Sequence, residues 1–156
     1  MMILNLMGFI FVAPVSLPPP PLVRAVRFGN AQLGRPYRWG GGHGDRGRRG
    51  YDCSGLASAI ARTAGYSGPT ITTYTAARYS RKIKRGQKFP VQWGLRNTHM
   101  VIRVWWKNKW RVYNASRSGT RIHLGSYGSF TWYVPKGLER IPHPESLSIN
   151  VLQGGN

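Results

Sequence analysis

The chain has 156 residues, of which 41% are hydrophobic and 12% aromatic, so it is long enough for one globular domain and too apolar for a disordered protein. Twenty-three Lys and Arg residues against four acids give a net charge of +19, which favours a polyanionic partner: nucleic acid, anionic lipid or the phosphate-rich polymers of a bacterial wall. The four acids form no obvious pair, which argues against a glycosidase, and the histidines show no HExxH spacing, which argues against a zinc site. The single cysteine excludes an internal disulfide.

The N-terminal residues differ in composition from the rest of the chain. Residues 1–17 are nearly all apolar and fit an arm that packs on the body, a signal peptide or a membrane anchor, although Pro14 interrupts the run and no Lys or Arg precedes Arg24. The prolines of residues 18–21 predict a stiff polyproline II spacer. We therefore expect an arm or signal-like segment over 1–21, a domain over 22–141 and an extended peripheral tail over 142–156.

Helices are predicted in the first half of the domain. Apolar residues at helical spacing predict a helix over 22–33, followed by a loop rich in glycine and arginine over 35–50. A second helix is predicted from Cys53 to Ala64, with Gly65 as its C-terminal stop. A short helix fits residues 72–83.

Strands are predicted in the second half. They cover residues 85–94, where Pro90 limits the strand, and then 99–106, 109–115, 120–125 and 129–135. In the strand over 99–106, one face carries Met100, Ile102, Val104 and Trp106 and is the better core face. Helices followed by an antiparallel sheet predict an α+β fold.

The single cysteine stands at the start of the second helix. A helix N-terminus stabilises a thiolate, so Cys53 fits a nucleophile, although a buried and inert thiol is the alternative. His99 opens a strand and is the candidate base. If the next hairpin turns through Lys107 and Asn108, Val101 lies opposite Asn114, which places Asn114 diagonally from His99 as an orienting group.

From about Val26 to Tyr133 the sequence resembles the NlpC-type family of cell-wall cysteine peptidases. The segments that carry the resemblance are AQLGRPYRWGGG, YDCSGLASAIARTAG, THMVIRV and YNA. The resemblance implies a papain-like core, with N-terminal helices packed on an antiparallel sheet of about five strands. It also implies Cys53 as nucleophile, His99 as base and Asn114 as orienter. Tyr37 would help to hold an oxyanion, Asp52 and Ser54 would line the substrate groove, and neither a metal nor a cofactor is expected.

Such enzymes cleave peptide or amide bonds in peptidoglycan stem peptides, so the resemblance implies a peptidoglycan hydrolase, of a bacterium or a phage, that acts outside the cell or facing the wall. The basic surface would bind anionic wall polymers, no specific nucleic acid is expected, and the oligomeric state stays open. Two alternatives remain: a nucleic-acid binder using the basic clusters RGRRG and RKIKRG, and a catalytically inactive wall-binding or structural protein. The chain departs from the family in the extra residues 43–50, HGDRGRRG, and we expect His43 and His123 on the surface.

Overall fold

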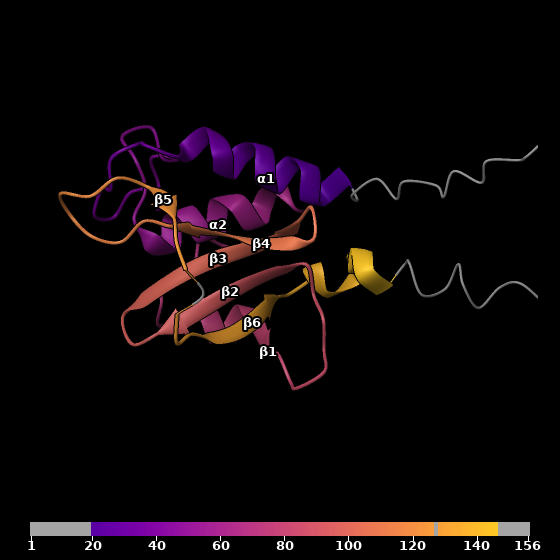
Figure 1. The fold of residues 1–156 in the computed structure, drawn as a ribbon. Helices are drawn as coiled ribbons and strands as arrows, with labels where there is room; N and C mark the ends of the chain where they lie inside the picture. Colours follow the sequence, from indigo (N-terminus) through magenta and orange to yellow (C-terminus); the bar gives the residue numbers. More distant parts are fainter. Residues whose placement is uncertain (1–19, 127, 147–156) are drawn as a thin grey trace, which may run out of the picture.

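The computed structural model describes residues 20–126 and 128–146, which form two layers (Figure 1). Helices α1 (Pro20–Gln32) and α2 (Cys53–Thr63) lie on one side of a six-stranded antiparallel sheet. The strands are β1 (Ser80–Lys82), β2 (Val91–Arg96), β3 (His99–Trp106), β4 (Lys109–Asn114), β5 (His123–Leu124) and β6 (Thr131–Pro135). Their order in the sheet is β1-β6-β2-β3-β4-β5, and two short 3₁₀ helices, η1 (Ala76–Tyr79) and η2 (Leu138–Arg140), precede β1 and follow β6. The predicted α+β class is confirmed, with one strand more than expected.

Helix α1 begins earlier than the sequence predicts. Pro20 and Pro21 form its first turn instead of a polyproline spacer, since proline fits the first helical positions, where its missing N–H has no partner to lose. The buried stripe of α1 contains Leu22, Ala25, Val26 and Gly29, at the predicted helical spacing. Residues 1–17, considered as an arm, signal peptide or anchor, lie outside the described residues.

Helix α2 follows its predicted bounds closely. Its N-cap is Asp52, whose side chain accepts a hydrogen bond from the Gly55 N–H at 2.7 Å. At the other end Ala64 is the C-cap and Gly65 adopts φ +112°, a conformation that glycine reaches most easily. The two caps fix the place where the helix starts, and therefore the position of Cys53.

The β3–β4 hairpin has the predicted register. Lys107 and Asn108 form a two-residue turn with φ of 48° and 62°, and Ile102 pairs with Tyr113. Both positive φ values fit the type I′ turn that matches strand twist. Continued by one residue, this register sets Val101 opposite Asn114, so Asn114 is a diagonal neighbour of His99.

The core lies between the helices and the sheet. Met100, Ile102 and Val104 are completely buried, as the alternation predicts, whereas Trp106 is only partly buried. Val101 is also buried, so part of the opposite face of β3 is covered too.

The start of the C-terminal segment also differs from the expectation of a peripheral tail. His143 is 4% exposed, and its ring packs at 4.9 Å from that of Trp105. In the described part of the chain, no helix combines the length and apolar character needed to cross a membrane.

Candidate active site

Cys53 is the first residue of α2 and lies against the first residues of β3. The backbone N–H groups of Met100 and Ser54 lie close enough to its thiol to lower the thiol pKa. Met100 directly follows His99, so the packing of α2 on β3 brings the cysteine to the strand end that carries the histidine. Cys53 remains partly exposed. The thiol is therefore held close to His99 and is accessible from outside.

The surroundings of Cys53 act on its pKa in both directions. Burial has the largest effect and raises the pKa of the thiol, the Met100 N–H lowers it, and the neighbouring Asp52 carboxylate raises it; the net direction is upward. This differs from the sequence expectation of a stable thiolate, because the cost of desolvating the anion exceeds the stabilisation by the helix N-terminus. The raised pKa favours the neutral thiol over the thiolate in the resting protein.

His99 is held by Asn114 from the neighbouring strand. Its Nε2 lies 3.0 Å from Asn114 Oδ1, which leaves Nδ1 for another partner. Burial lowers the pKa of His99, the Asn114 hydrogen bond raises it, and the positive charges of Arg96 and His123 lower it; the net direction is downward. The lowered pKa favours the neutral imidazole, which is the form that can accept a proton.

Tyr37 lies beside the same thiol. Its side chain is 8% exposed, and burial raises the pKa of its hydroxyl, as do the charges of Cys53 and Asp52. A backbone bridge between Tyr37 and Tyr51 fixes its position next to α2. A protonated hydroxyl near the sulfur can donate a hydrogen bond to a group held at Cys53.

Asp52 and Ser54 contact each other and a residue from the additional loop. Asp52 Oδ1 lies 3.0 Å from His43 Nε2 and accepts from Ser54 Oγ at 3.2 Å and from the Gly55 N–H. Its Oδ2 accepts from the Gly40 N–H at 3.1 Å. Both oxygens are therefore engaged within the protein, and Asp52 joins the glycine loop to α2.

A groove of about 270 Å³ opens at Cys53. Tyr37, Asp52 and Ser54 line it, and Thr98, just before β3, lies at its edge. His43 lines it too, and its side chain, 24% exposed, contacts Asp52 and Ser54. His123 is exposed, as expected, and its ring Nδ1 lies 3.0 Å from the Arg121 carbonyl oxygen.

Sequence reasoning missed two aromatic residues of this groove. Trp39 and Tyr74 both line it, and they are 87% and 83% exposed. Trp39 lies in the glycine-rich loop, within the segment AQLGRPYRWGGG, and Tyr74 lies in a turn before η1, where we expected a short helix over 72–83. No pattern therefore pointed to either residue as part of the groove. Two exposed rings at one groove can hold the apolar parts of a ligand.

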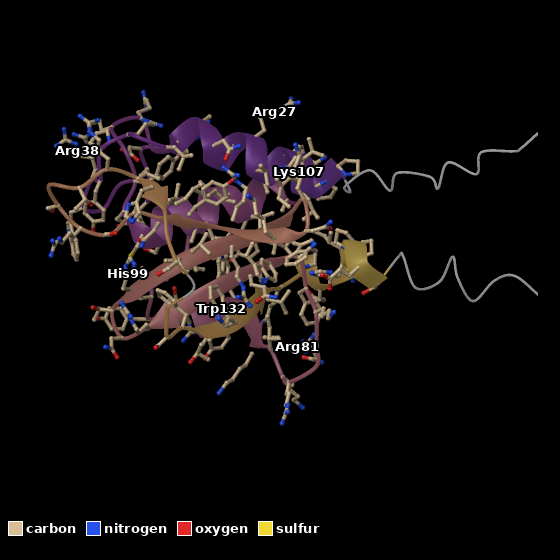
Figure 2. All side chains as sticks on the ribbon, viewed as in Figure 1. Arg27, Arg38, Arg81, His99, Lys107 and Trp132 are labelled. Carbon is tan, nitrogen blue, oxygen red and sulfur yellow. The ribbon has the colours of Figure 1, made fainter. Side chains whose placement is uncertain are left out.

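Figure 2 shows His99 and Arg38 toward the same end of the molecule, with Arg27 along α1 and Arg81 at the opposite side of the sheet. Over residues 20–126 and 128–146, no three His, Cys, Asp or Glu side chains gather in a way that could hold a metal ion. The chemistry of the site is that of a thiol, an imidazole, an amide and a phenol.

Comparison with known proteins identifies the family of the chain. The model of the NlpC/P60 family matches residues 34–132, which include Tyr37, Cys53, His99 and Asn114. The chain belongs to the NlpC/P60 family. Among curated proteins, none matches the sequence.

Three solved structures show the same fold. An NlpC/P60 family protein from Bacillus cereus is 16% identical, with a TM-score of 0.55 over 78% of this chain and 40% of that one. The peptidoglycan hydrolase RipB of Mycobacterium tuberculosis is 21% identical, with a TM-score of 0.52 over 74% of this chain and 64% of that one. A hypothetical invasion protein of M. tuberculosis is 24% identical, with a TM-score of 0.51 over 74% and 61%. This chain thus spans less than two thirds of the length of each.

Proposed function

We propose that this NlpC/P60 domain hydrolyses a peptide or amide bond in the stem peptides of peptidoglycan, with Cys53 as nucleophile. The observation that carries the proposal is the position of Cys53, which opens α2 and touches β3 next to the His99–Asn114 pair. Family membership and the similarity of fold to a peptidoglycan hydrolase support this substrate class.

The first half of the reaction forms an acyl-enzyme. His99 takes the proton from the Cys53 thiol as the sulfur attacks the carbonyl carbon, so a C–S bond forms and the carbonyl oxygen becomes negative. The Tyr37 hydroxyl and the Cys53 backbone N–H at the start of α2 can donate hydrogen bonds to this oxygen. His99 then gives its proton to the leaving nitrogen, and the C–N bond breaks.

The second half releases the product. His99 takes a proton from water, the hydroxide adds to the thioester carbon, and the C–S bond breaks with return of the proton to sulfur. Asn114 keeps the imidazole in one orientation through both halves, because its Oδ1 accepts from Nε2 and leaves Nδ1 toward the reacting groups.

The basic surface fits the same substrate. Peptidoglycan is accompanied by anionic wall polymers, and a net charge of +19 would hold the enzyme on them. Such binding would place the protein on the wall-facing side of a membrane.

Digestion of purified peptidoglycan tests the proposal. We expect wild-type protein to release fragments with new amino termini, identified by mass spectrometry, and Cys53→Ala and His99→Ala to release none. Arg27→Ala is the control, since Arg27 is exposed on α1 and lies away from His99 in Figure 2, and it should keep most of the activity. If Cys53→Ala releases the same fragments as wild type, the proposed mechanism is wrong.

A further inference from the structure

A second cavity lies beside the groove of Cys53, formed by the additional loop. It has a volume of about 640 Å³ and is lined by Arg38, Arg49 and the loop residue Asp45. Trp39, Gly40 and His43 line both this cavity and the groove, so the two spaces adjoin. A peptide bound at Cys53 that extends past Trp39 would enter the cavity.

The loop is held in a defined shape by its own hydrogen bonds. Asp45 Oδ1 accepts from the Gly42 and Gly47 N–H groups at 2.8 Å each, and Arg35 donates to the Gly47 carbonyl oxygen at 2.7 Å. The Asp45 carboxylate is therefore largely occupied by hydrogen bonds from the backbone. The cavity wall is preformed and does not have to be ordered by a ligand.

The two arginines are the charged groups that remain for a ligand. Arg49 is 85% exposed, and its Nε lies 4.0 Å from Asp45 Oδ2, a weak pair in water. The Arg38 guanidinium has no hydrogen-bond or carboxylate partner among the described residues, while its backbone N–H is fixed to the Tyr51 carbonyl oxygen at 3.0 Å. Arg38 thus presents a free guanidinium from an anchored backbone.

The backbone also requires a glycine next to Arg38. Gly50 has φ +124°, and a Cβ built on it would lie 2.5 Å from the Pro36 carbonyl oxygen and 2.8 Å from Arg38 Cγ. A side chain at residue 50 would therefore collide with the Arg38 stem. Tyr37 is buried at the groove, and Arg38, the next residue, is exposed at the cavity.

We infer that Arg38 and Arg49 form an anion subsite that binds a free carboxylate of the peptide held at Cys53. Guanidinium groups match the planar, two-oxygen geometry of a carboxylate, and Trp39 can cover the chain between the subsite and the scissile bond. The inference rests on the proposed function for the identity of the peptide. It predicts that the protein prefers a stem peptide with a free glutamate carboxylate to the same peptide amidated at that group.

The test measures binding separately from cleavage. The Cys53→Ala protein is titrated with a synthetic stem tetrapeptide carrying a free glutamate carboxylate and with its amide, and wild type is assayed for cleavage of both. We expect about fivefold tighter binding of the free acid, which is the size of one or two solvent-exposed charge pairs. Arg38→Gln and Arg49→Gln, each combined with Cys53→Ala, should reduce this preference toward one.

Arg27→Gln in the same background is the matched control, because it removes one exposed positive charge on α1, away from the cavity. It should keep the preference. Equal affinity for acid and amide, or a preference that both glutamine variants retain, overturns the subsite.

A preference for inorganic phosphate over the free-acid peptide in displacement titrations would also overturn it, since the cavity would then serve wall phosphates. If wild type cleaves neither peptide but the Cys53→Ala protein shows the Arg38-dependent preference, the subsite stands and the hydrolase proposal fails.

Discussion

Gly29 is the position where a single methyl group should disturb both the fold and the site. It lies in the buried stripe of α1 and faces the ring of Tyr113, which is completely buried on β4. A Cβ at residue 29 would lie 2.6, 2.7 and 2.9 Å from Cζ, Cε1 and Cε2 of Tyr113, whereas ordinary contact begins at 3.4 Å. The ring or the helix must therefore move by up to 0.8 Å, the difference between 3.4 and 2.6 Å.

The expected magnitude for Gly29→Ala follows from three contributions. Overpacking of a filled core costs about 1–3 kcal/mol. The Tyr113 hydroxyl donates to Asn30 Oδ1 at 2.9 Å and lies 3.3 Å from the Val26 carbonyl oxygen, and weakening these contacts costs about 1 kcal/mol. Alanine has the higher helix propensity, so replacing glycine within a helix stabilises the folded state by about 1 kcal/mol. We expect the free energy of unfolding to fall by about 2 kcal/mol, the middle of that range.

Urea unfolding followed by circular dichroism measures this change. Ala31→Gly, at an exposed position of the same helix, calibrates the helix-propensity contribution without a packing change. In Gly29→Ala/Tyr113→Leu the smaller side chain accommodates the methyl, so the double variant should lose less stability than the sum of the single variants. A Gly29→Ala protein as stable as wild type would refute the packing argument. Because Tyr113 precedes Asn114, we also expect reduced hydrolysis.

Three further changes test the site. Asn114→Ala should lower the pKa of His99 and Asn114→Asp should raise it, because the amide oxygen, and more so a carboxylate, stabilises the imidazolium. NMR titration of the His99 ring in the Cys53→Ala protein measures both shifts, and a titration unchanged in both variants would contradict the contact between His99 and Asn114. Since burial raises the pKa of Cys53, its alkylation by iodoacetamide should be slow in mildly acidic buffer and rise only above the ordinary thiol range; fast labelling in acid would instead indicate a preformed thiolate. Gly55→Ala should destabilise the protein by roughly 1–3 kcal/mol or more, since its Cβ would overlap the Gly41 carbonyl oxygen, and thermal unfolding unchanged from wild type would disprove that overlap.

The sequence by itself determined the features that depend on near neighbours in the chain. Helical spacing and Gly65 located α2 to within one residue, and the alternation of residues identified the face of β3 that carries Met100, Ile102 and Val104 as the core face. The hairpin register followed from two residues, Lys107 and Asn108, because a two-residue turn leaves one pairing for the strands it joins. That register set Asn114 beside His99.

Only the tertiary structure decided what depends on segments far apart in sequence. The pKa of Cys53 is one example. The helix N-terminus, which would lower this pKa, is visible in the sequence, but the burial that raises it comes from the packing of α2 on β3. The engagement of Asp52 by His43 and Gly40, the burial of His143 on Trp105 and the cavity of Arg38 and Arg49 likewise arise where loops without periodicity fold back on the domain. Such loops carry no repeating pattern, so their contacts depend on the shape and charge of the surfaces on which they pack, which are formed by residues far away in the sequence.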